Sequence, residues 1–211
     1  MLIRPLIAML LLTPLALAQE TTPPLFAADT PIIDYQHPQL PDYGRIGMVV
    51  SPEKLAGDIG LDMLKQGGNA VDAAVATGFA LAVTLPRAGN LGGGGFMLVH
   101  LAETDEQIFI DYRETAPAAA SRDMFLNADG TVNKAKAYFS RQAAGVPGTV
   151  AGLVHAQTQY GKLPLATVIQ PAIDLAEQGF DTPLALNMSL TSRAERLAMD
   201  PEAKRIYLQG T

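Results

Sequence analysis

Apolar and polar residues alternate along the chain with two different periods, and each period predicts its own kind of element. Over residues 55–63 an apolar side chain recurs every four positions, aspartate occupies positions between them, and Lys54 and Lys65 lie on either side. This spacing places the apolar residues on one face of a helix. We expect that helix to have Ser51 as its N-cap and Pro52 at its first position, and to end at Gly67-Gly68.

A second helix is predicted from Ala70 to Val83. Asn69 is a favourable N-cap, and Asp72 places a negative charge near the helix start, where it suits the helix dipole. The segment is rich in alanine and apolar almost all round, which is typical of a helix buried on every side. We therefore expect it at the centre of the fold.

A β-hairpin is the clearest extended element. Two runs of β-forming residues, Phe96–Leu101 and Gln107–Arg113, are joined by the polar turn Ala102–Glu106. Because successive side chains of a strand point to opposite faces, one face of the second strand is apolar and the other carries two charges. The apolar face holds Ile108, Ile110 and Tyr112, and the other holds Phe109, Asp111 and Arg113.

The remaining segments are less regular. Residues 46–50 form a short apolar run that predicts a buried strand, and residues 116–143 are rich in loops, with a turn at 127–130. The last third is helical, with helices expected near 150–160, 165–178 and 183–199. Together these elements predict an α+β fold that is mostly helical.

The first 43 residues form two segments ahead of the folded body. Residues 1–18 combine Arg4, an apolar run too short for a good membrane span, and small residues before Gln19, as in a secretory signal peptide. Residues 19–43 carry five prolines with little periodicity, which favours an extended proline-rich arm. We expect a periplasmic or secreted protein that leaves the membrane after signal cleavage; an uncleaved anchor is the alternative.

Composition narrows the partners and the chemistry. The 211 residues carry a formal charge of −6 without a run of like charge, so nucleic acid is not an expected partner. The absence of cysteine excludes disulfides, a thiol nucleophile and cysteine metal sites. A hydrophobic content of 48% is enough to build a core.

Few residues are candidates for a site. Gly92–Gly95 precedes a strand and lacks a P-loop lysine, so we expect close backbone approach there rather than phosphate binding. His37, His100 and His155 lack metal-ligand spacing, and we expect neither a metal nor a cofactor. Arg113 offers a planar fork at the end of an apolar strand, which suits a bound carboxylate; a structural salt bridge is the alternative.

Five motifs occur in one order along the chain, and together they carry a family resemblance. They are Gly47–Ser51, Gly67–Ala76, Ala88–Met97, Asp111–Pro117 and Gly145–Gly152. In this order they resemble the N-terminal part of the large subunit of γ-glutamyltransferases, the glutathione hydrolases. The resemblance extends over residues 44–211.

The resemblance implies an N-terminal-nucleophile hydrolase with an αββα sandwich, made as one precursor that cuts itself into a large and a small subunit. The new N-terminal threonine of the small subunit is the nucleophile, and its own amine can serve as the base, so no cofactor is required. The γ-glutamyl group of glutathione or a similar compound passes to water or an amino acid. The arginine that holds the α-carboxylate of this group corresponds to Arg113.

The chain departs from the family pattern because no threonine up to Thr211 stands in the setting of the self-cleavage point. We therefore expect residues 44–211 to be an incomplete domain that is inactive alone and exposes apolar surface. A truncated, non-catalytic remnant or accessory protein is the alternative. Within the enzyme class, a relative acting on cephalosporin side chains or on poly-γ-glutamate is a narrower possibility.

Overall fold

The computed structural model describes residues 42–208, which belong almost entirely to the compact unit Tyr43–Thr211. The predicted signal peptide, residues 1–18, lies outside the described residues, as does the predicted arm except for Asp42 and Tyr43. Among the helices of the described part, none combines the length and apolar character needed to cross a bilayer.

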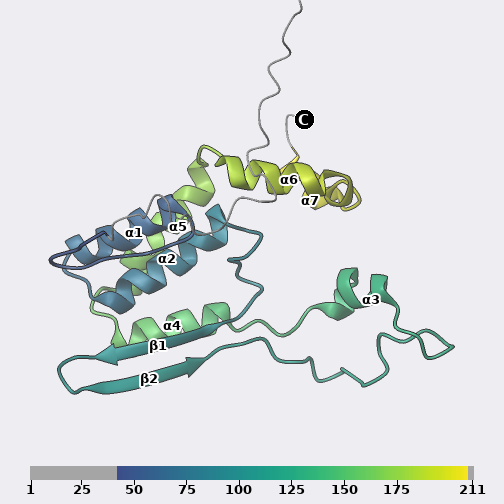
Figure 1. Ribbon diagram of the computed structural model, residues 1–211, viewed down its shortest axis with the longest axis horizontal. Coiled ribbons are helices and arrows are strands. Elements are labelled where there is room, and N and C mark those ends of the chain that lie inside the picture. The colour runs from purple at the N-terminus through teal and green to yellow at the C-terminus, as the bar shows by residue number, and fades with distance from the viewer. Residues whose placement is uncertain (1–41, 209–211) are drawn as a thin grey trace, which may run out of the picture. The chain divides into compact units, whose positions relative to one another are not determined.

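The described residues form the mostly helical α+β arrangement that the sequence predicts (Figure 1). The strands are β1 (Phe96–Leu101) and β2 (Glu106–Asp111). The helices are α1 (Lys54–Lys65), α2 (Ala70–Thr84), α3 (Lys134–Phe139), α4 (Thr149–Tyr160), α5 (Leu165–Gln178), α6 (Leu184–Leu197) and α7 (Pro201–Tyr207), with a short 3-10 turn η1 (Arg141–Ala143).

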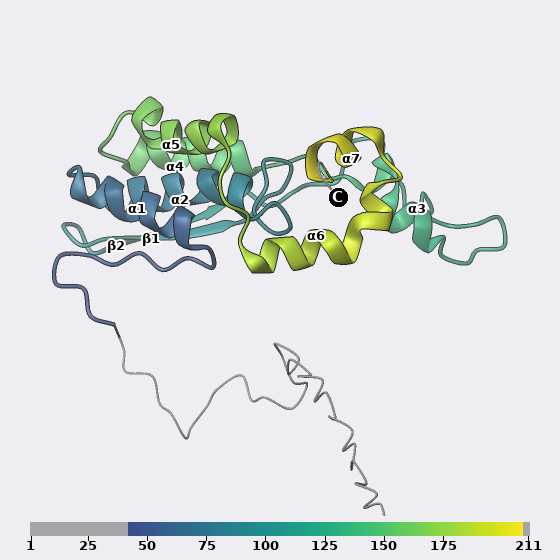
Figure 2. The same cartoon turned by 90° about the horizontal axis from the view of Figure 1, so that it is seen from above.

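Helix α2 is the centre of the core, as predicted. It packs against α1, α4 and α5, and Figure 2 shows α1 beside α2 and α4 beside α5. Its small residues Ala76 and Ala80 are fully buried. At Gly78 an added Cβ would lie 3.2 Å from the side chain of Leu153 on α4. The alanine and glycine content of α2 therefore lets its neighbours approach closely.

Asp72 joins α2 to the turn between α4 and α5. Its side chain is fully buried and accepts hydrogen bonds from the backbone N–H of Asn69 (2.6 Å), completing a capping box. It also accepts from Nε2 of Gln157 (2.6 Å) and from the N–H groups of Lys162 (3.0 Å) and Leu163 (2.9 Å). Asp72 therefore connects segments about 90 positions apart in the sequence.

The antiparallel hairpin β1–β2 has helices on one face. Its register runs from Phe96↔Asp111 to Leu101↔Glu106. Ile108 and Ile110 pack toward the helical core, whereas Phe109 points outward with 63% exposure, so the predicted alternation of faces is confirmed. The strand ends two residues earlier than predicted, at Asp111.

The outward face of the hairpin carries exposed apolar side chains beside the polar Gln107 and Asp111. Leu98 is 71% exposed, and the rings of Phe96 and Phe109 stack with their centroids 5.8 Å apart. Within residues 42–208 these three side chains are all more than half exposed, and Figure 1 shows helices on only one side of the hairpin. Exposed apolar patches of this kind mark a contact surface or an aggregation site.

We predict that the isolated chain aggregates through this face, and that replacing Leu98 and Phe109 together by threonine keeps it in solution. Threonine retains the β preference of both positions and removes exposed apolar surface. Size-exclusion chromatography of the two proteins checks the result. The inward change Val99→Thr serves as the control, because it places a hydroxyl at a buried position and should not improve solubility. A wild-type chain that elutes as a monomer and unfolds reversibly would contradict the prediction.

The expected strand at residues 46–50 is wrong for the described structure. The segment has no strand partner among residues 42–208, and Ile46 and Val50 are exposed. A strand needs a neighbour for its backbone N–H and C=O groups, and the described residues supply none here. The apolar pattern alone therefore could not predict the state of this segment.

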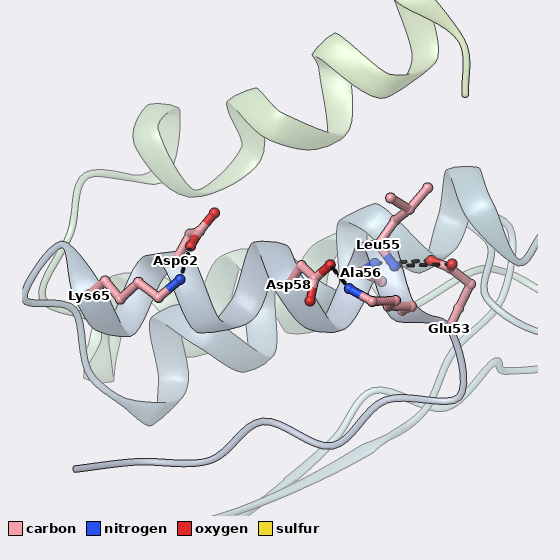
Figure 3. A network of polar contacts seen from close by, with 7 residues as sticks. Glu53, Leu55, Ala56, Asp58, Asp62 and Lys65 are labelled. Carbon is pink, nitrogen blue, oxygen red and sulfur yellow. Dashed lines mark hydrogen bonds and ion pairs between the residues drawn. The ribbon is translucent and has the colours of Figure 1, made fainter. Parts of the chain in front are cut away.

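The start of α1 also differs from the prediction. Its N-cap is Glu53 rather than Ser51, and the Glu53 carboxylate accepts the N–H groups of Leu55 and Ala56 at 3.0 Å each (Figure 3). A carboxylate at this position satisfies two helix N–H groups at once, which explains the later start. Figure 3 also shows exposed ion pairs along α1, which contribute little to stability: Lys54–Asp58 and Lys65–Asp62.

Candidate functional site

Arg113 follows the end of β2 and is exposed. Its backbone N–H donates to Oδ1 of Asp111 at 3.0 Å, which fixes the turn of the chain after the strand. Within residues 42–208 the guanidinium has neither an ion pair nor a side-chain hydrogen bond. The structural salt bridge that the sequence allowed therefore has no partner in the described part of the chain.

The hollow beside Arg113 has a volume of about 420 Å³. Its walls come from segments that are distant in the sequence, including Gly92, Pro117, Phe125 and Gln142. The volume is in the range of small-molecule pockets, but the hollow is open to solvent and its lining, which includes Glu114, is polar as much as apolar. Arg113 is the cationic side chain on its border.

Two backbone hydrogen bonds link Thr115, which lines this hollow, to Val146. The N–H of Thr115 donates to the carbonyl of Val146 at 3.2 Å, and the N–H of Val146 donates to the carbonyl of Thr115 at 2.9 Å. This bridge joins the motif around Arg113 to the motif that opens α4. Sequence reasoning identified both motifs but not their pairing, because about thirty residues separate them.

The glycine loop, Gly92–Gly95, precedes β1 in the sequence. In space it lies between the end of β2 and the start of α4. The carbonyl of Gly93 accepts the N–H groups of Gly148 (2.9 Å) and Thr149 (3.0 Å). A Cβ added to Gly94 would lie 2.6 Å from the carbonyl oxygen of Tyr112. Such a contact is far below van der Waals distance, so the close backbone approach predicted for Gly92–Gly95 is confirmed at Gly94, whereas a Cβ at Gly92 would meet only the side chain of Asn90 at 3.5 Å.

We predict that Gly148→Ala destabilises the chain by about 1–3 kcal/mol, because the new methyl group must push against neighbouring backbone. The added Cβ would lie 1.9 Å from the Tyr112 carbonyl oxygen, which is a steric clash. Gly57→Ala in α1 is the matched control, since its Cβ would meet only Ser51 at 3.4 Å and should stabilise the helix slightly. Urea unfolding followed by circular dichroism compares the two, and equal midpoints would contradict the prediction.

The histidines do not form a site in the described residues. His100 and His155 are exposed on β1 and α4, and His37 lies outside the described range. No cluster of three or more His, Cys, Asp or Glu side chains suited to a metal occurs within residues 42–208. Within residues 42–208 the structure therefore brings neither His100 nor His155 to Arg113.

The helical layer on one face of an antiparallel hairpin is part of an N-terminal-nucleophile hydrolase fold. The profile of the family described as gamma-glutamyltranspeptidase matches residues 56–211, and the chain belongs to that family.

Similar proteins extend well beyond this chain. It is 51% identical over 162 residues to the glutathione hydrolase proenzyme of Escherichia coli K12, covering 76% of this chain and 28% of that protein. It is 42% identical over 185 residues to the Bacillus subtilis 168 glutathione hydrolase proenzyme, covering 86% and 31%. The chain thus spans about three-tenths of the length of these relatives.

Solved structures give the same assignment. The crystal structure of Helicobacter pylori gamma-glutamyltranspeptidase matches with a TM-score of 0.75 and 43% identity, over 79% of this chain and 47% of that one. The gamma-glutamyltranspeptidase of Pseudomonas nitroreducens complexed with L-DON matches with a TM-score of 0.74 and 38% identity, over 80% and 50%.

Proposed function

We propose that this chain supplies the donor-binding part of a periplasmic or secreted enzyme that cleaves γ-glutamyl amides such as glutathione and passes the γ-glutamyl group to water or an amino acid. The observation that carries the proposal is the exposed guanidinium of Arg113 on the border of the 420 Å³ hollow. A guanidinium can hold the α-carboxylate of a γ-glutamyl donor through two parallel hydrogen bonds.

In the proposed reaction the nucleophilic threonine belongs to a small subunit that is not among these residues. Its hydroxyl oxygen attacks the γ-amide carbon, the amide C–N bond breaks, and the proton passes through the threonine amine to the departing amine. Water or an amino acid amine then attacks the resulting ester and releases the threonine hydroxyl. The part of Arg113 is to bind and orient the donor, so the isolated chain has no activity.

Arg113 also bears on which donor is preferred. A guanidinium at the donor site selects for substrates that carry a carboxylate, because only these form the paired charge-assisted hydrogen bonds with it. A donor with a free α-carboxylate is therefore favoured over an acyl group that lacks one. This distinguishes γ-glutamyl amides from most cephalosporin side chains.

The test joins this chain in frame to the part of the Escherichia coli proenzyme that follows the matching segment. We term this fusion the completed enzyme. It should release p-nitroaniline from γ-glutamyl-p-nitroanilide, whereas the 211-residue chain alone should not. A soluble, folded fusion without activity would overturn the proposal and favour the non-catalytic remnant. The unmodified Escherichia coli enzyme is the positive control.

A further inference from the structure

The side chain next to Arg113 occupies a slot built from glycines. Tyr112 is half-buried, and its ring lies against α4 and the glycine loop. A Cβ on Gly152 would lie 2.2 Å from Cγ of Tyr112, and a Cβ on Gly95 would lie 2.9 Å from its Cε2. Any larger residue at either position would collide with the ring.

The backbone of Tyr112 is confined in the same way. Its N–H donates to the carbonyl of Gly95 at 3.0 Å. A Cβ added to Gly94 would lie 2.6 Å from the Tyr112 carbonyl oxygen, and a Cβ added to Gly148 would lie 1.9 Å from the same oxygen. Gly148 and Gly152 are one helical turn apart, so they share one face of α4. Ring and backbone of Tyr112 are thus held between the same two segments.

We propose that Tyr112 is the positioning residue of Arg113: its ring, seated in the slot formed by Gly95 and Gly152, and its carbonyl group, held against Gly94 and Gly148, fix where the guanidinium enters the hollow. This inference rests on the proposed function. Adjacent side chains in extended backbone point to opposite sides, so a ring fixed in the core directs the next residue outward. Arg113 has no polar side-chain partner within residues 42–208 that would orient it instead.

The consequence for catalysis follows from the precision that donor binding requires. A misplacement of about 1 Å in a binding group can cost about 100-fold in rate. An arginine on an exposed turn has many rotamers and a mobile backbone unless the chain beneath it is fixed. The seated ring of Tyr112 removes the backbone mobility.

The aromatic ring of Tyr112, rather than its hydroxyl, carries this role. The hydroxyl makes no hydrogen bond with any group among residues 42–208, and burial raises its pKa, so it stays neutral near pH 7. Phenylalanine has the same ring and should fill the slot equally well. Alanine leaves the slot empty and should free the backbone of Arg113.

The experiment compares two donors in the completed enzyme. One is γ-glutamyl-p-nitroanilide, and the other is 4-aminobutyryl-p-nitroanilide, which is the same molecule without the α-carboxylate. The readout is the ratio of their kcat/KM values. Tyr112→Ala should lower this ratio about tenfold, mainly through a higher KM for the γ-glutamyl donor. Tyr112→Phe should leave the ratio unchanged, as should the matched control Tyr138→Ala at an exposed position.

The outcomes separate this inference from the proposed function. If Tyr112→Ala lowers kcat/KM for both donors equally, its role is structural only and the inference is overturned. If Arg113→Ala itself leaves the ratio unchanged, the proposed carboxylate contact fails, whatever Tyr112 does. Should Tyr112→Ala prove insoluble, Tyr112→Leu keeps apolar bulk in the slot and is judged by the same ratio.

Discussion

Arg113→Ala in the completed enzyme should lower kcat/KM for γ-glutamyl-p-nitroanilide by about 100-fold, because two charge-assisted hydrogen bonds to the α-carboxylate are lost. Arg113→Lys should have a kcat/KM between those of the wild type and Arg113→Ala, since an ammonium keeps the charge but not the planar fork. Initial rates over a range of donor concentration give both kcat and KM. The effect should appear mainly in KM if the contact is equally strong in the ground state and the transition state.

A surface arginine provides the control for this result. Arg122 is exposed and pairs with Asp123 at 2.9 Å, and Arg122→Ala should leave the kinetics unchanged because exposed pairs contribute little. Equal losses for the variants of Arg113 and Arg122 would show that general surface charge, rather than a specific contact, is being measured. An active Arg113→Ala enzyme with unchanged KM would remove Arg113 from the donor site.

Asp72→Ala should be the most destabilising single change in the described fold, by about 4 kcal/mol. The substitution removes an acceptor from Nε2 of Gln157, which keeps only its bond to the Leu163 carbonyl, and it leaves the part-buried N–H groups of Asn69 and Leu163 without their acceptor. Asp72→Asn should cost less, because one amide oxygen still accepts. Urea unfolding of the chain that carries the soluble hairpin changes would measure both variants. Urea midpoints equal to that of the parent chain would contradict a stabilising role for the Asp72 hydrogen bonds.

The pH dependence of stability gives an independent check on Asp72. Burial raises the pKa of this carboxyl, but the hydrogen bonds from Gln157, Asn69, Leu163 and Lys162 together outweigh burial and lower the pKa below its usual value. Asp72 therefore stabilises the fold above the unfolded pKa of about 3.9, and that stability is lost as the pH falls through the folded pKa. The free energy of unfolding should fall more steeply below about pH 3.9 for the wild type than for Asp72→Asn.

Local signals predicted the elements whose structure depends on neighbours in sequence. Helix α2 begins at Ala70 beneath its Asn69 cap, and α5 spans Leu165–Gln178 as predicted. The predicted N-cap of α1 was wrong because serine is a preferred N-cap and glutamate is not, so local preference favoured Ser51 over Glu53. Helices α3 and α7 were not predicted; both are short, and short helices give little periodicity.

The sequence pattern did not predict which residues far apart in the chain lie in contact. Asp72 was expected only to suit the helix dipole, whereas its partner Gln157 lies 85 residues away. The position of Arg113 at a strand end was predicted from alternation, but the hollow beside it depends on the bridge between Thr115 and Val146. Periodicity identifies which face of an element is apolar and does not identify the segment that covers it.

The bridge between Thr115 and Val146 also makes the intervening segment 116–145 a loop with anchored ends. The entropy cost of closing a loop grows only with the logarithm of its length, so doubling this segment would cost about 0.6 kcal/mol. Its residues form part of the wall of the hollow, whereas Arg113 is fixed from the other side of the bridge. Under the proposed function, insertions and deletions here would reshape the wall of the hollow while the proposed carboxylate contact of Arg113 is kept, so donor preference could change at a small cost in folding free energy.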